Sequence, residues 1–199
     1  MVLRTKLPAR RKNIVELPPV KDVINAVRGT DIELPTMLAL WLSLSVSEIR
    51  GIQVSAIKDG HLTIQESVVQ VEGVAVSKKA TKAYERTRKL NLPDYIMKLI
   101  EKTEAWQKGE GYIETRSGSA VASRFQRVIR NAGLPHMRFH DLRHMNASVM
   151  AMLDVPDIYA MERGGWKTKT VLTGVYQHTF SQERLAVDRK MDDYFNSLF

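Results

Sequence analysis

The residues best suited to chemistry in this chain lie in one short segment, residues 138–144, which reads RFHDLRH. If this segment forms a helix, His140 and Arg143 lie one turn apart on the same face. An arginine offers a charged, forked set of donors, and a histidine adds a further donor, so the pair suits a phosphate group. The plainer interpretation is the polar, solvent-exposed first turn of a helix. Phosphate binding by His140 and Arg143 is therefore the first hypothesis.

The same segment allows a second interpretation, a zinc site. His140 and His144 are spaced as in the zinc motif HExxH, with aspartate at the glutamate position. His136 or His178 could provide a third ligand. Two features count against zinc: the carboxylate is one methylene shorter than the general base of HExxH, and Arg143 would place a positive charge beside the metal. We expect no metal here, and a zinc-dependent hydrolase remains the alternative from another class.

A tyrosine further along the chain could act as a nucleophile. Residues 164–168 read GGWKT and residues 175–180 read VYQHTF, which contains Tyr176. Taken alone, a tyrosine near a helix end is usually a packing residue, and the chain has six tyrosines. Neighbouring cations change this, because they stabilise both a phenolate and the charge on the non-bridging oxygens of a phosphate. Combined with residues 138–144, Tyr176 is a candidate for attack on a phosphorus centre.

Residues 42–51, LSLSVSEIRG, have an ambiguous pattern. Their alternation of apolar and polar residues is typical of a half-buried strand, but the preceding run PTMLALW favours a buried helix. Ser45 and Glu48 have the spacing of a capping box, in which the serine and the glutamate each bond a free backbone N–H. We therefore interpret this stretch as the end of one helix and the capped start of another.

The elements that must position these residues are mainly helical. Apolar periodicity and helix stop signals predict helices over 20–27 and 35–44, around 96–100 and 121–129, and starting near His140, Pro156, Thr168 and Ser181. Alternating, β-branched segments predict strands at 61–65, 68–71, 74–76 and 88–92, the last two joined by a lysine-rich tip. The expected fold class is mixed, mainly α with a small antiparallel three-stranded β-sheet.

The charge of the chain points to an anionic partner. Its 199 residues suffice for one domain, or for one large and one small domain. The formal net charge is +8, there is no cysteine, and no apolar run approaches a membrane span. The basic residues gather in two clusters, which suits a nucleic-acid backbone. The candidate DNA-binding residues are Arg10, Arg11, Lys12, Lys78, Lys79, Arg86 and Arg88.

In this order along the chain, the RFHDLRH segment, the Gly164-Gly165-Trp166 turn and the VYQH segment resemble the catalytic domain of tyrosine recombinases, the phage integrase family. Residues 162–168 and 175–180 are most similar to integrases of phages and mobile elements of low-GC Gram-positive bacteria. The resemblance runs from about Val15 to the C-terminus. It implies the tyrosine recombinase catalytic-domain fold over residues 14–199, with residues 1–13 as a basic linker from an N-terminal DNA-binding region.

The resemblance implies a role for each matching residue. Tyr176 matches the nucleophile that becomes joined to a DNA 3′-phosphate, and Arg143 and His140 match the second arginine and its histidine partner, which hold the phosphate. Trp166 falls where many members have histidine; its indole N–H can donate to a phosphate oxygen but cannot shuttle a proton. Lys82 takes the place of the hairpin lysine that protonates the departing 5′-oxygen, or else it is one more phosphate-contacting cation.

The first catalytic arginine of the family is absent. The family pattern Gly-Leu-Arg-x-Ser-Glu corresponds to residues 43–48, SLSVSE, so Ser45 stands at the arginine position and Glu48 matches the acidic residue that supports the site. Arg50 lies roughly 140° around a helix from Ser45 and should point elsewhere. Removing a charged donor costs roughly 3–4 kcal/mol. The resemblance therefore implies a weakened or inactive site, by natural decay or by engineering.

The function implied is site-specific DNA recombination and integration for a phage or mobile element, in the cytoplasm of a bacterial host. Strands of double-stranded DNA are cleaved and rejoined through a phosphotyrosine intermediate, with no cofactor. Four protomers assemble on two duplexes, so we expect a tetramer on DNA and a monomer alone. The amphipathic C-terminal helix would dock on a neighbour or on its own domain. A non-cleaving DNA-binding or regulatory relative is the alternative within the family.

Overall fold

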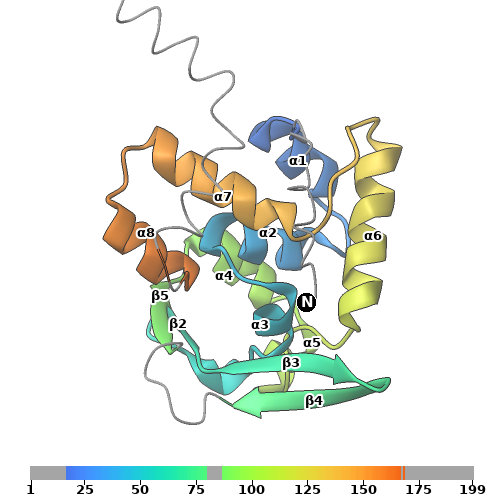
Figure 1. Ribbon diagram of the computed structural model, residues 1–199. Coiled ribbons are helices and arrows are strands. Elements are labelled where there is room, and N and C mark those ends of the chain that lie inside the picture. Colours follow the sequence, from blue (N-terminus) through green and yellow to red (C-terminus); the bar gives the residue numbers. More distant parts are fainter. Residues whose placement is uncertain (1–16, 80–86, 167, 169–199) are drawn as a thin grey trace, which may run out of the picture.

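The structure of the protein is a computed structural model that describes residues 17–79, 87–166 and 168 (Figure 1). The described part is mainly helical, as expected. Its helices are α1 (Val20–Val27), α2 (Glu33–Leu42), α3 (Val46–Arg50), α4 (Asp94–Ile100), α5 (Glu104–Lys108), α6 (Gly118–Asn131), α7 (Asp141–Met152) and α8 (Asp157–Gly164), with a 3₁₀ turn at Val54–Ala56. None of these helices is long and apolar enough to span a membrane. The helices expected from Thr168 and Ser181 onward, and the linker at 1–13, lie outside the described residues.

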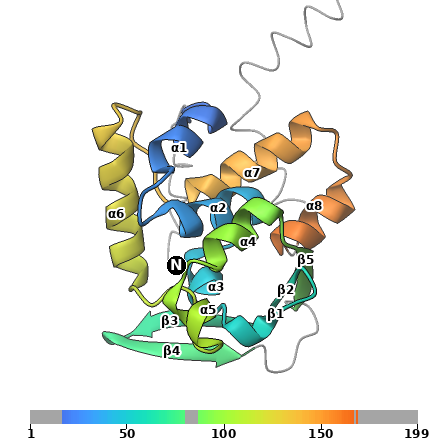
Figure 2. The same cartoon turned by 180° about the vertical axis from the view of Figure 1, so that it is seen from behind.

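Helix α2 lies at the centre of the helical part. It contacts α1, α3, α4 and α7, which lie around it in both views (Figures 1 and 2). Because it is covered on so many sides, nearly all of its residues are buried, from Glu33 to Leu42. A helix that is apolar all round must be buried in this way. This explains the run PTMLALW, and it makes α2 the support on which α3 and α7 are placed.

The junction between α2 and α3 depends on Ser43. This residue has φ 58° and ψ 32°, the left-handed conformation that ends many helices, and it is fully buried. The family pattern has glycine here. Helix α2 therefore ends at Leu42, before the expected position 44. Two residues after Ser43, Ser45 is the N-cap of α3, with extended backbone at φ −74° and ψ 157°.

We expect Ser43→Gly to raise the free energy of unfolding by about 1–2 kcal/mol. Glycine adopts the left-handed conformation without the steric penalty of a Cβ. The substitution also removes the Ser43 hydroxyl, which is buried and finds no hydrogen-bond partner in the described part of the chain. Urea denaturation measures the change. Ser43→Ala, which removes only the hydroxyl, should gain less, and a loss of stability in the glycine variant would contradict this account of the junction.

The strands form two sheets, which corrects the expected topology. A three-stranded antiparallel sheet has the order β1-β2-β5, from Ile57–Lys58, His61–Ile64 and Arg88–Asn91. A separate two-stranded ribbon pairs β3 (Glu66–Val71) with β4 (Val74–Lys79). The strands at 74–79 and 88–91 therefore do not pair with each other, as a hairpin around the lysine-rich tip would require.

The register of β5 explains why it joins β2. Leu62 lies opposite Leu90, and Ile64 lies opposite Arg88, so the buried positions of the two strands share one face. A shift by one residue would turn Leu90 to solvent. Meanwhile α3 contacts β3, and a Cβ on Gly51 would lie 2.5 Å from the carbonyl oxygen of Glu66. Glycine at position 51 therefore permits β3 to pack closely against the end of α3.

Candidate functional site

The site is organised around the carboxylate of Glu48, at the first turn of α3. The predicted capping box is confirmed: the Glu48 amide donates to the Ser45 hydroxyl, and Glu48 Oε2 accepts from the Ser45 backbone N–H at 2.8 Å and from its hydroxyl at 2.7 Å. The other oxygen, Oε1, accepts from Arg88 Nη1 at 2.6 Å. Arg143 Nη1 lies 3.3 Å from Oε2. Glu48 thus joins α3 to β5 and α7.

The charge of Glu48 is stabilised despite its burial. Burial alone would raise the pKa of this carboxyl, but the Arg88 charge, the Arg88 hydrogen bond and the two Ser45 bonds together hold the pKa below its ordinary value of 4.5. Glu48 is therefore ionised at neutral pH. We call Ser45, Glu48, Arg88 and Arg143 the Glu48 cluster.

Arg143 is held in place from three sides. It comes from the first turn of α7, and its side chain is 12 % exposed. Besides the Glu48 contact, its Nη2 donates to the Gly164 carbonyl at 2.7 Å, and its guanidinium lies 5.7 Å from the centre of the Trp166 ring. Its Nε is buried and has no hydrogen-bond partner within residues 17–79, 87–166 and 168. Burial and the nearby Arg88 charge lower the pKa of Arg143, and the Glu48 charge opposes them.

Arg88, one of the expected DNA-binding residues, lies in the Glu48 cluster and not on an exposed surface. Its side chain is only 8 % exposed, because it lies on the same inward face of β5 as Leu90. Its Nε donates to the Arg163 carbonyl at 3.1 Å, in addition to the Glu48 bond. Alternation along Arg88, Leu90 and Leu92 was the sequence signal for an inward side chain. The neighbouring basic residues had instead favoured an exposed, DNA-contacting position for Arg88.

The Gly164-Gly165 turn makes room for these side chains. Gly165 ends α8 with φ 64°, and a Cβ on it would lie 2.7 Å from Arg88 Nη1. A Cβ on Gly164 would lie 2.3 Å from atoms of the Trp166 ring. The two glycines therefore let Arg88 and Trp166 approach the backbone of this turn closely. Any larger residue at either position would displace one of them.

The start of α7 fixes His140 next to Arg143. Asp141 accepts from the Arg138 backbone N–H at 2.7 Å and from its guanidinium, which anchors the first turn. His140 is exposed and is the N-terminal flanking residue of the helix, one turn before Arg143 as expected. Partial burial and the Arg143 charge lower the pKa of His140 below 6.5. His140 is thus mainly neutral at pH 7, so it can either donate or accept a proton.

The described residues give no support to the zinc alternative. The rings of His140 and His144 pack edge to face with centroids 5.2 Å apart. Within the part of the chain that the structure describes, no group of three histidine, aspartate or glutamate side chains is placed to hold a metal. His178, one of the two possible third ligands, lies outside that part.

Two further arginines, Arg50 and Arg88, have different roles. Arg50 donates from Nε to the Arg116 carbonyl at 2.9 Å and from Nη1 to the Val68 carbonyl at 3.2 Å. It points away from Glu48, which confirms the expectation from helix geometry. Ser45 itself contributes a neutral hydroxyl that is already bonded to Glu48. Arg88, from a strand 40 residues later, bonds the carboxylate of Glu48.

The structure brings together only some of the predicted residues. Ser45, Glu48, Arg143 and Trp166 form one connected group, with His140 beside it. Lys78 is exposed on β4. The backbone of Lys79 is described but its side chain is not. The other predicted residues lie outside the described part of the chain: Arg10, Arg11, Lys12, Lys82, Arg86 and Tyr176.

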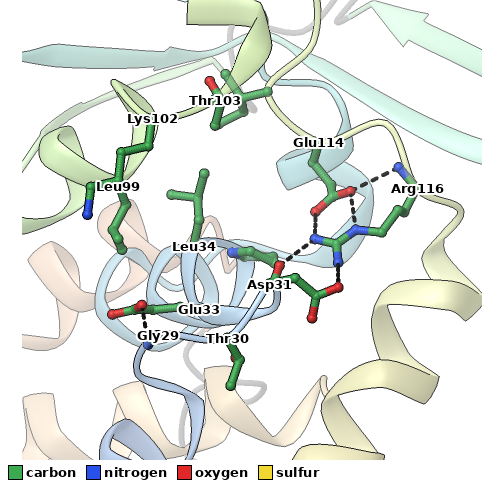
Figure 3. A pocket seen from close by; sticks show the side chains of 12 residues that line it. Gly29, Thr30, Asp31, Glu33, Leu34, Leu99, Lys102, Thr103, Glu114 and Arg116 are labelled. Carbon is green, nitrogen blue, oxygen red and sulfur yellow. Dashed lines mark hydrogen bonds and ion pairs between the residues drawn. The ribbon is translucent and has the colours of Figure 1, made fainter.

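A surface pocket of about 320 Å³ lies elsewhere and shares no residue with the Glu48 cluster (Figure 3). It is lined by the α1–α2 loop and by residues before α6. Arg116 points across it to Asp31, at 3.0 Å, and to Glu114, at 2.6 Å. Its lining has three acidic residues, Asp31, Glu33 and Glu114, against the two basic residues Lys102 and Arg116, so this pocket is a poor anion site.

Comparisons with known proteins agree with the residue pattern. A family model described as the phage integrase family matches residues 20–183. An integrase of Saccharopolyspora erythraea is 30% identical over 125 residues, which cover 54% of this chain and 28% of the relative. A XerC-like tyrosine recombinase of Caldanaerobacter subterraneus subsp. tengcongensis is 19% identical over 208 residues, covering 88% of this chain and 53% of the relative. The chain thus spans about half or less of the length of these relatives.

The fold is also found among solved structures. The Tn1549 transposon integrase in complex with transposon right-end DNA matches with a TM-score of 0.73 and 15% identity, over 92% of this chain and 68% of that one. At this identity the match establishes the fold of the described part. The mainly helical fold class with small antiparallel sheets is therefore confirmed.

Proposed function

Because this chain belongs to the phage integrase family, we propose that it is the catalytic domain of a site-specific DNA recombinase. It cleaves and rejoins double-stranded DNA through a 3′-phosphotyrosine intermediate. The observation that supports this best is the state of Arg143. Its guanidinium is held by Glu48 and the Gly164 carbonyl, yet its buried Nε has no acceptor in the part of the chain that the structure describes. A phosphate oxygen supplies such an acceptor.

The chemical step is a transfer of a phosphoryl group. The Tyr176 phenol oxygen forms a bond to phosphorus, and the bond from phosphorus to the 5′-oxygen breaks. The phenol proton passes to neutral His140, and Lys82 donates a proton to the departing 5′-oxygen, so charge and protons balance. Arg143 and the Trp166 N–H stabilise the charge on the non-bridging oxygens. The free 5′-hydroxyl later reverses the step, since the phosphotyrosine bond retains the energy of the phosphodiester.

Ser45 sets the expected rate. Without the family's first arginine, the site loses a charged donor worth about 3–4 kcal/mol, unless another group supplies that charge. We infer a chain that cleaves DNA, at a rate set by how much of that charge another group supplies, rather than one that only binds DNA. Its assembly on DNA follows the family, with four copies on two duplexes and a monomer in their absence.

The test uses the whole chain and a pool of nicked duplexes of random sequence. Protein–DNA adducts that survive detergent and heat are recovered, and the enriched duplex becomes the substrate for all variants. Adducts formed by the wild-type chain but not by Tyr176→Phe support the proposal. If the pool yields no adduct with either the wild-type chain or Ser45→Arg, while both still bind DNA, the chain is a non-cleaving DNA-binding relative.

Lys78 should contact the DNA backbone. It is exposed on the β3–β4 ribbon, opposite Ser67. We expect Lys78→Gln to reduce the slope of log binding constant against log salt by about 0.9, the value for one phosphate contact. Fluorescence anisotropy on a short duplex at several salt concentrations measures this. Lys98→Gln removes the same charge from an exposed position on α4 and should leave the slope unchanged. Equal effects of the two variants would argue against a contact at Lys78.

A further inference from the structure

Arg88 brings a second guanidinium to the carboxylate that Arg143 contacts. Arg88 Nη1 bonds Glu48 Oε1 at 2.6 Å, and Arg143 Nη1 lies 3.3 Å from Glu48 Oε2. The two cations therefore flank one anion. Because arginine stays charged at neutral pH, this centre keeps one net positive charge. A phosphodiester, with one negative charge, would neutralise it.

The hydrogen-bond donors of the two arginines are not all satisfied. Arg88 uses Nε for the Arg163 carbonyl and Nη1 for Glu48, and its Nη2 is buried with no partner among the described residues. The Nε of Arg143 is likewise buried with no partner among the described residues. Buried donors without acceptors are unfavourable and rare, and they call for an explanation. Two of them beside one carboxylate, in a centre of net positive charge, indicate a site for an oxyanion.

We propose that Arg88 supplies the second guanidinium of the phosphate site, in place of the charge that is missing at Ser45. This inference rests on the proposed recombinase function. Arg88 Nη2 donates to a non-bridging oxygen of the scissile phosphate, while Nη1 and Nε keep the side chain fixed on Glu48 and the Arg163 carbonyl. The absence of a Cβ at Gly165 allows this placement. A purely structural tie between β5, α3 and α8 would need no free donor.

Single-turnover cleavage of the selected duplex gives the first test. We expect Arg88→Met to slow cleavage by about 100-fold or more, as for loss of one charged donor. Ser45→Arg should raise the wild-type rate by less than about tenfold, because the charge is already present. Adding Ser45→Arg to Arg88→Met should restore about tenfold or more of the lost rate, since either arginine can meet the phosphate. Arg124→Gln, an exposed arginine on α6, is the matched control.

A substrate with a neutral methylphosphonate at the cleaved position separates charge from structure. Without the charged oxygen, the reaction depends less on a second cation, so the defect of Arg88→Met should shrink. A defect of equal size on both substrates would mean that Arg88 only holds the fold, and it would overturn the inference.

If Arg88→Met fails to fold, the Ser45→Arg variant still tests the inference, because it retains Arg88. A rise of several hundredfold would show that no other residue supplies the missing charge. If neither the wild-type chain nor Ser45→Arg cleaves the DNA, the recombinase function itself is wrong. Cleavage by both, at a rate that Arg88→Met leaves unchanged, contradicts the role of Arg88 alone.

Discussion

Replacing Arg143 by alanine is expected to slow DNA cleavage by about 10²–10³-fold, the effect of removing one preorganised donor from a site that excludes water. Arg143 is preorganised because Glu48, the Gly164 carbonyl and the Trp166 ring hold its guanidinium before any DNA arrives. No reorganisation is therefore needed when charge develops on the phosphate. Single-turnover cleavage of the selected duplex measures the effect.

Arg143→Lys distinguishes charge from geometry. Lysine retains the positive charge but lacks the planar fork, so its rate should lie between those of the wild-type chain and Arg143→Ala. The fold should survive both changes, because Glu48 still pairs with Arg88. Arg124→Gln, which removes a charge outside the site, should cleave at the wild-type rate. Full activity in Arg143→Ala would exclude Arg143 from the phosphate site.

Glu48→Gln is expected to lower the free energy of unfolding by about 3 kcal/mol, the lower end of the range for breaking a buried ion pair. The amide leaves the Arg88 and Arg143 charges without a counter-ion beside them. We take the lower end because the Glu48 side chain is 18 % exposed. For a chain of this size, the midpoint of thermal unfolding should fall by roughly 6–12 °C.

The stability effect of Glu48→Gln should depend on pH. The folded-state pKa of Glu48 lies below its ordinary value of 4.5, so its contribution to stability is complete above about pH 4.5. That contribution is lost as the pH falls towards the lowered pKa and Glu48 takes up a proton. The stability difference between the wild-type chain and Glu48→Gln should therefore narrow below about pH 4.5. A difference that stays constant from pH 7 to pH 3 would mean that the charge of Glu48 is not the cause.

Glu104→Gln is the matched control for Glu48→Gln. Glu104 also forms an ion pair, with Lys108 at 2.5 Å, but both side chains are largely exposed on α5. Water and salt screen such a pair, so its loss should leave the unfolding midpoint almost unchanged. An equal effect of both substitutions would contradict the importance of burial at Glu48.

Local signals in the sequence predicted much of the fold. The periodicity of residues 20–27 predicted α1 with its observed bounds, and the spacing of Ser45 and Glu48 predicted the capping box at the start of α3. Both features depend on residues within one or two turns of each other. For the same reason, the direction of Arg50 away from the site followed from helix geometry alone.

The sequence could not predict features that depend on distant contacts. Arg88 pairs with a residue 40 positions earlier and with a carbonyl 75 positions later, so no local pattern marks it as part of the site. The separate β3–β4 ribbon also involves distant contacts, because β3 packs against the end of α3, where Gly51 lies close to Glu66. Ser43 adopts a conformation that glycine usually occupies, and serine gives no signal for it.

The most direct test of the recombinase function is to identify the residue that becomes attached to DNA. The covalent adduct is digested with nuclease and trypsin, and the modified peptide is sequenced by mass spectrometry. We predict a nucleotide phosphate on Tyr176, the only tyrosine in the tryptic peptide of residues 170–184. A modification on any other residue, or an adduct that persists in Tyr176→Phe, would contradict cleavage through Tyr176.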